Sequence, residues 1–95
     1  MITNNLFFKL KENNDENIGK VKEILLSMKG TIDELQDIRG EVDIRHGAAS
    51  YDIMLINQYK SMEDLKAYII HPVHKEVVNN MKEFMDGSVS VCYES

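Results

Sequence analysis

The chain is poor in residues that cross-link the backbone or bind strongly charged partners. Its 95 residues include one cysteine, one proline and no tryptophan. The lone cysteine, Cys92, excludes an internal disulfide and a zinc site built on cysteines. Eleven basic residues against sixteen acidic ones give a net charge of −5, which argues against binding to nucleic acid or to an anionic membrane. No apolar run is long enough for a signal peptide or a membrane span, so we expect a cytoplasmic protein.

The length and composition are those of one compact domain. Hydrophobic residues make up 43% of the chain and charged residues 28%, as in ordinary globular proteins. We therefore treat residues 1–95 as a single domain. A domain of this size buries only a modest share of its surface, so a core shared between two subunits would add stability.

Four segments alternate in the manner of β-strands. The first, residues 2–11, places four apolar side chains on the same face as Asn4: Ile2, Leu6, Phe8 and Leu10. A weaker strand is predicted over about residues 35–44, and one of its faces carries Ile38, Gly40, Val42 and Ile44. Residues 51–60 form the clearest strand, and residues 88–94 alternate as the last. The strand over 51–60 has apolar groups on both faces, which indicates that both faces meet something dry.

In the two long segments between these strands, the apolar residues have the spacing of amphipathic helices. The first predicted helix ends near Lys29, before Gly30, and its apolar face consists of Ile18, Val21, Ile24, Leu25 and Met28. The second helical region starts at Ser61, which can cap the backbone, with Asp64 three residues later. Because a residue before proline is pushed away from helical angles, we expect a break at His71–Pro72 and a restart through about Met85.

The resulting order is strand–helix–strand–strand–helix–strand. Two β-α-β halves of this kind form an α+β, ferredoxin-like βαββαβ sandwich with a four-stranded antiparallel sheet. Helices can cover only one face of such a sheet. The other face, which carries Met54 and Ile56, then needs a partner, and a symmetric homodimer is the economical solution.

The sequence also resembles a known family, the stress-responsive A/B barrel (Dabb) domains. The matching segments are "FFKLK", "YDIMLINQYKSMEDLKAYIIHPVHKEVV" and "SVSVCYE". The most specific part is "YIIHPVH", residues 68–74. The resemblance implies a homodimer whose two sheets close into one β-barrel with the helices outside.

The resemblance implies less about activity. The family includes plant stress proteins, unassigned bacterial members and a plant polyketide cyclase. In that cyclase the tyrosine and the second histidine of the motif have catalytic roles, and they correspond to Tyr68 and His74 here. The cyclase also has a cavity-facing histidine on its first strand, where this chain has Asn4. A shared fold does not by itself carry a reaction with it.

His74 and Tyr68 are the candidates for chemistry. His74 shares a helical face with four apolar residues, Val77, Val78, Met81 and Met85, so it should point between the helix and the sheet. A neutral histidine there can act as a general base, and a tyrosine hydroxyl can hold a substrate oxygen. The alternative is structural: His74 hydrogen-bonds a backbone carbonyl or Tyr68 and fills the core.

The remaining histidines fit structural or solvated positions. His71, directly before Pro72, should cap the restarted helix, and His46 lies in an exposed connection. Because no third ligand accompanies His71 and His74, we expect no metal site. The chain has no glycine-rich phosphate loop or nucleotide fingerprint, and we expect no cofactor.

Two asparagines and an apolar wall complete the predicted site. Asn4 and Asn57 could orient an oxygenated ligand within an apolar wall formed by Leu6, Phe8, Val77 and Met81. Alternatively, Asn4 lies too near the terminus to be buried, and Asn57 faces the seam of the barrel.

Two functions follow from these patterns. One is a homodimer without an assigned activity that is stress-related or binds a small apolar or aromatic ligand between helices and sheet. The other is an enzyme in which His74 abstracts a proton next to a carbonyl while Tyr68 holds the oxygen. A pocket of a few hundred cubic ångströms reached by both residues would favour binding or catalysis over a purely structural role.

Overall fold

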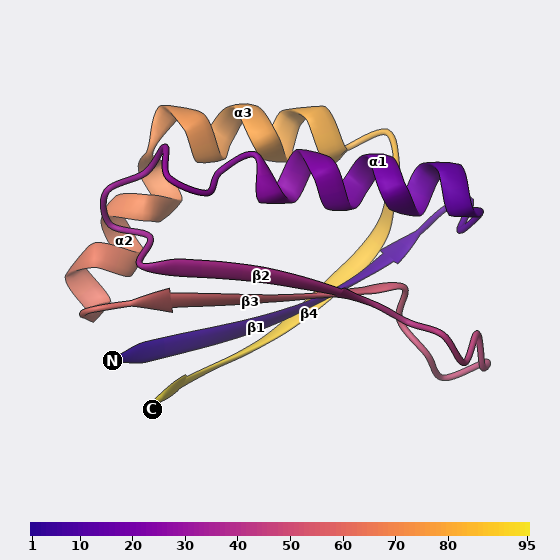
Figure 1. The fold of residues 1–95 in the computed structure, drawn as a ribbon, viewed down its shortest axis with the longest axis horizontal. Helices are drawn as coiled ribbons and strands as arrows, with labels where there is room; N and C mark the ends of the chain where they lie inside the picture. Colours follow the sequence, from indigo (N-terminus) through magenta and orange to yellow (C-terminus); the bar gives the residue numbers. More distant parts are fainter.

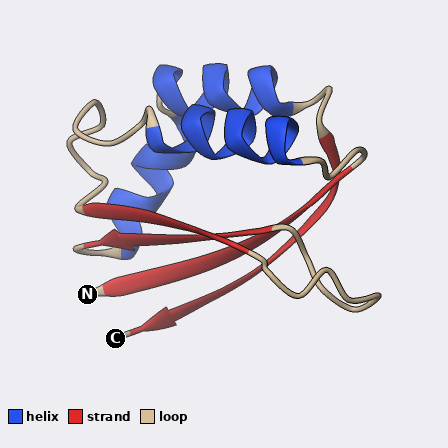
Figure 2. Ribbon diagram, turned by 45° about the vertical axis from the view of Figure 1, so that its right-hand side comes forward, coloured by secondary structure: helices blue, strands red, loops and turns tan.

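The three helices lie together on one face of a four-stranded sheet (Figures 1 and 2). The computed structural model describes residues 1–95. Its elements, in chain order, are β1 (Ile2–Leu10), α1 (Asp15–Leu26), β2 (Asp37–Val42), β3 (Ile53–Tyr59), α2 (Met62–Ile70), α3 (Pro72–Met81) and β4 (Met85–Glu94). The sheet is antiparallel in the order β2-β3-β1-β4. The ferredoxin-like α+β fold is therefore confirmed. No helix is both long and apolar enough to cross a lipid bilayer.

Helix α1 starts at a capped end and stops in a glycine turn. The Asn14 side chain accepts a hydrogen bond from the Asn17 backbone N–H at 2.8 Å, and acidic residues occupy the first turn. The helix ends at Leu26, slightly before the predicted Lys29. Gly30 follows with φ of 76°, a conformation that costs glycine little.

The break between α2 and α3 is confirmed, and His71 forms it. His71 has extended backbone angles, and its ring Nδ1 accepts a hydrogen bond from the Val73 N–H at 3.1 Å. Pro72 then takes the first position of α3, where its missing N–H costs nothing.

The predicted end of this helix at Met85 is wrong. Helix α3 ends at Met81, and Met85 opens β4 opposite Leu10 of β1. The Lys11 N–H donates to the Phe84 carbonyl at 2.9 Å, so pairing with the sheet captures the chain here.

The predicted strand over residues 35–44 is too long. Ile38 and Gly40 are buried as expected, but Val42 is 38% exposed and Ile44 is 91% exposed. Pairing with β3 stops at Val42, opposite Ile53, and the chain then leaves the sheet in a loop. Without a partner strand or a covering helix, Ile44 has nothing to pack against.

The hydrophobic core lies between the helices and one face of the sheet. Sixteen buried residues form it as one cluster, with Val21, Leu55 and Tyr59 almost fully buried. The opposite face of the sheet is covered by no element (Figure 2). On that face β4 exposes Val89, Val91 and Tyr93 by 51%, 59% and 45%.

Candidate functional site

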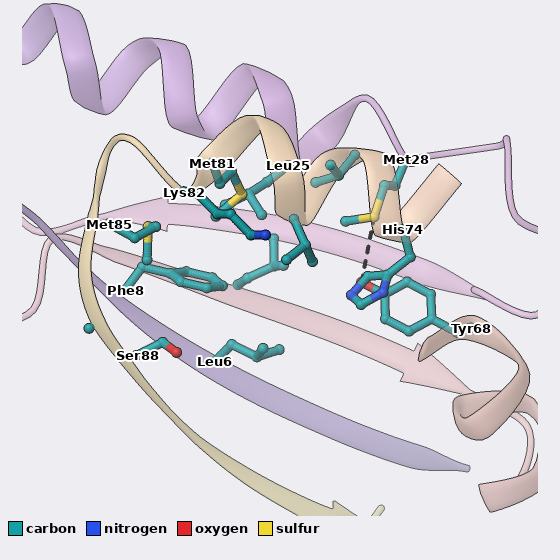
Figure 3. A pocket seen from close by; sticks show the side chains of 14 residues that line it. Leu6, Phe8, Leu25, Met28, Tyr68, His74, Met81, Lys82, Met85 and Ser88 are labelled. Carbon is teal, nitrogen blue, oxygen red and sulfur yellow. Dashed lines mark hydrogen bonds between the residues drawn. The ribbon is translucent and has the colours of Figure 1, made fainter. Parts of the chain in front are cut away.

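A cavity of about 390 Å³ lies between the helices and the sheet (Figure 3). Every helix and the strands β1, β3 and β4 contribute to its wall. The wall is mainly apolar, with ten hydrophobic residues among fourteen. The polar groups of the wall are supplied by Tyr68, His74, Lys82 and Ser88. A few polar groups in an apolar wall are typical of a small-molecule site.

Tyr68 and His74 lie side by side in this wall. Their ring centroids are 4.4 Å apart, and the ring planes are tilted by 46°. Tyr68 comes from the last turn of α2 and is 6% exposed, whereas His74 comes from the first turn of α3 and is half-buried. The helix break thus brings a hydroxyl and an imidazole to one position on the cavity.

The break also supplies a hydrogen-bond partner for His74. Its Nδ1 lies 3.0 Å from the backbone carbonyl oxygen of Ile69. Carbonyls in the last turn of a helix lack intrahelical partners, and this one is free because α2 stops at Ile70. A carbonyl can only accept, so Nδ1 carries the proton, and Nε2 of the neutral ring keeps its lone pair.

The hydroxyl of Tyr68 is held by two neighbours. The Asn57 side-chain amide donates to it at 3.3 Å, and the hydroxyl donates to the Met28 sulfur at 3.5 Å. A thioether is a weak acceptor, so a ligand oxygen could replace it. Burial raises the pKa of Tyr68 to about 12. The group therefore remains a protonated donor at neutral pH.

A second tyrosine shares the same amide. Asn57 also donates to the Tyr59 hydroxyl at 3.1 Å, and the two tyrosine rings lie 5.2 Å apart. Burial, reinforced by the neighbouring Tyr68, raises the pKa of Tyr59 strongly. Asn57 itself has no exposed surface. The amide therefore fixes the Tyr68 hydroxyl from behind the cavity.

The structure brings together most of the residues expected at the site. Six of them line the cavity: Leu6, Phe8, Tyr68, His74, Val77 and Met81. Asn4 and Asn57 do not line it. They are direct cross-strand partners, and the side-chain oxygens of both are buried without a hydrogen-bond partner. A ligand-binding role of these residues stays a prediction.

Several wall residues were not expected. Leu25 of α1 and Met28, just after this helix, also line the cavity. Both belong to the apolar face predicted for the first helix, and this was the only feature of the sequence that could have indicated their role. Lys82 lies eight residues after His74, on the same helical stripe, but the charged segment around it resembles a solvated surface. The chain holds no cluster of three histidine, cysteine, aspartate or glutamate side chains that could bind a metal ion.

Comparison with solved structures first defines the class of fold. A dimeric protein of unknown function and ferredoxin-like fold from Bacteroides fragilis is 21% identical, with a TM-score of 0.84 over 99% of this chain and 95% of that one. At3g17210 from Arabidopsis thaliana is 18% identical, with a TM-score of 0.84 over 100% and 95%. Hydroxynitrile lyase from Passiflora edulis is 12% identical, with a TM-score of 0.82 over 97% and 90%. At these identities the likeness establishes the fold.

The family follows from the sequence itself. The family model of the Stress responsive A/B Barrel Domain, Dabb, matches residues 2–95. The chain therefore belongs to the Dabb family. No curated protein matches the sequence.

Proposed function

We propose that this Dabb protein is a homodimer that binds a small, mainly apolar molecule, with an oxygen of the ligand held at Tyr68 and His74. The observation that carries the proposal is the cavity of about 390 Å³, whose apolar wall has these two polar side chains together. A volume of this order suits a ligand with one aromatic ring or a short alkyl chain.

The dimer is supported by the uncovered face of the sheet. Exposed apolar residues on β4 occupy a face that no helix covers, and such patches are typical of protein interfaces. Two structurally similar proteins, from Bacteroides fragilis and Thermobifida fusca, are described as dimeric. The cavity lies on the opposite, helix-covered side of the sheet, so pairing through the uncovered face leaves it open to a ligand.

Native mass spectrometry of the freshly purified protein tests both parts of this proposal. We expect the mass of a dimer plus a small molecule that is released on denaturation. Val77→Phe should fill the cavity and abolish retention of that molecule, whereas Ile44→Phe, in an exposed loop, should not. A stable monomer would contradict the dimer. Equal retention by both variants would contradict binding in this cavity.

A second candidate function is enzymatic, because Tyr68 and His74 lie together in the cavity wall and His74 is hydrogen-bonded to the Ile69 carbonyl oxygen. This bond assigns the proton to Nδ1 and leaves the Nε2 lone pair able to accept a proton from a bound ligand. Tyr68, which is protonated at neutral pH, can donate to a carbonyl oxygen as negative charge develops on it. His74 would then remove a proton from the carbon next to a carbonyl.

The same hydrogen bond fits the structural alternative, so a reaction must decide between them. Hydrogen–deuterium exchange at the carbon next to the carbonyl of an aryl ketone, followed by NMR, measures the proposed step. We expect His74→Ala to abolish the exchange that the protein catalyses while the dimer stays folded. His46→Ala, in an exposed loop, is the matched control and should retain it. Exchange that persists in His74→Ala would exclude this residue as the base.

A further inference from the structure

The cavity wall has an unusual charge composition for an acidic protein. The chain carries sixteen acidic residues, yet none of them lines the cavity. The one permanently charged side chain in the wall is Lys82. Figure 3 shows this side chain at the end of α3, on the border of the cavity, where the residue is also exposed to solvent.

Lys82 stands on a stripe that forms the border of the cavity. His74, Val78 and Lys82 are spaced four residues apart and so share one face of α3. The same three residues line a second, open hollow on the outer surface, together with Ile69, Lys75 and Asn79. This outer hollow also contains no acidic residue. The stripe therefore borders both the apolar cavity and an outer hollow that carries two lysines.

The ammonium group of Lys82 has no carboxylate partner in the chain. Glu23 and Glu83 line a polar groove between α1 and α3 that Lys82 also borders, but neither forms an ion pair with it. The one ion pair between a lysine and a carboxylate in the chain is Lys20–Glu16. An unpaired cation at the edge of an apolar cavity is free to pair with an anion on a ligand.

We propose that Lys82 selects ligands that carry a carboxylate, so that the natural ligand is an apolar carboxylic acid rather than a neutral molecule. This inference rests on the proposed function of the cavity. The apolar body of the ligand fills the space among Leu6, Phe8 and Val77, and its carboxylate pairs with Lys82. The Tyr68–His74 pair then contacts a second oxygen of the ligand, since the backbone positions of His74 and Lys82 lie about 12 Å apart along the helix and the two groups stand at different places on the wall.

A carboxylate fits this position better than a phosphate. Phosphate sites are often built from arginines or glycine-rich loops, and neither of these lines the cavity. Lys82 caps the C-terminus of α3, where the helix dipole is negative. The negative end of the dipole disfavours an anion, so the single charge of a carboxylate, paired with Lys82, is less unfavourable there than the two charges of a phosphate.

Matched ligand pairs test the inference by isothermal titration calorimetry on the purified dimer. The probes are phenylacetate, 4-phenylbutyrate and octanoate, each compared with its primary amide. At pH 7 each acid is ionised and each amide is neutral, although the apolar bodies are the same. We expect at least one acid to bind about two- to fivefold more tightly than its amide, as for an ion pair with an exposed lysine.

Three variants test whether Lys82 causes the preference for the acid over its amide. Lys82→Met removes the charge while keeping most of the unbranched side chain, and it should abolish the preference for the acid over its amide. Lys82→Arg should restore it. Lys29→Met, which removes an exposed lysine outside the cavity wall, is the matched control and should behave as the unmodified protein.

The outcomes separate this inference from the proposed function. Equal affinity for acid and amide, or a preference that survives Lys82→Met, would overturn the role of Lys82 and leave ligand binding in place. Absence of binding by every acid and every amide would overturn both.

Discussion

Tyr68 and His74 stand 4.4 Å apart, ring centroid to ring centroid, although six residues and a helix break separate them in the sequence. In an unbroken α-helix, six residues correspond to about 600° of rotation, which would leave the two side chains about 120° apart around the axis. The extended backbone of His71 changes the direction of the chain and removes this offset. The helix break in the motif "YIIHPVH" therefore places the tyrosine ring beside the ring of the second histidine.

The first prediction concerns the cap that holds this break. His71→Ala removes the acceptor of the Val73 N–H, and loss of such a cap costs about 1 kcal/mol. We expect the free energy of unfolding, from urea titration at one fixed protein concentration, to fall by about this amount. His71→Asn should recover most of it because asparagine also caps helices. Equal stability of the alanine and asparagine variants would contradict the capping role.

The second prediction concerns the dependence of stability on pH. Tyrosine has a pKa of about 10 in an unfolded chain, and burial raises the pKa of Tyr68 in the folded protein to about 12. The unfolded state therefore loses this proton first as the pH rises. Below pH 10 the raised pKa of Tyr68 stabilises the folded protein by about 2 kcal/mol, and this contribution is lost as the pH approaches 12.

Tyr68→Phe removes this contribution. Between pH 9 and pH 12, the free energy of unfolding of this variant should fall by about 2 kcal/mol less than that of the unmodified protein. Tyr51→Phe, outside the core cluster, is the control for loss of a phenol. The same pH dependence in Tyr68→Phe and the unmodified protein would contradict the buried state of the Tyr68 hydroxyl.

The fold could be predicted because its signals are local and redundant. Period-2 alternation, a capping serine at Ser61 and a single proline each indicate where one element ends and the next begins. The errors occur where tertiary pairing decides: β1 captures Met85 into β4, and β3 has no residue left to pair with Ile44. Neither pairing register can be read from the segment concerned.

The candidate site could be predicted only in part, for a related reason. A helical face shows that His74 points inward, but it does not show whether a space remains there. The volume depends on the packing of α1 against α3, and the sequence does not specify that packing. Lys82 was missed because a lysine beside a glutamate at the end of a helix is usually solvated; it is exposed in the fold as well, and only the fold shows that it borders the cavity.

The third prediction concerns the uncovered face of the sheet. Val91 is 59% exposed on this face, and a carboxylate placed there would be desolvated and unpaired in a dimer. We expect Val91→Asp to convert the dimer to monomer in sedimentation at micromolar concentration. Ile44→Asp adds the same charge in a loop outside the sheet and should leave the dimer intact. A dimer that survives Val91→Asp would show that this face is not the interface.

The fourth prediction contrasts the two asparagines that are partners across β1 and β3. Asn57 donates to both the Tyr59 and the Tyr68 hydroxyl, so Asn57→Leu leaves two buried hydroxyls without their donor and should lower the free energy of unfolding by about 1 to 3 kcal/mol. Asn4 makes no side-chain hydrogen bond, and its oxygen is buried without a partner. Asn4→Val removes that unsatisfied oxygen and adds a strand-forming side chain.

Urea titration of both variants at one protein concentration distinguishes the roles of the two residues. We expect Asn4→Val to be as stable as the unmodified protein or more stable by about 1 kcal/mol, while Asn57→Leu is less stable. Asn4 has no partner within the chain, so a loss of more than 1 kcal/mol in Asn4→Val would mean that its amide is satisfied from outside. In that case the group that satisfies the Asn4 amide belongs to another molecule, because Asn4 has no side-chain partner in this chain and does not line the cavity.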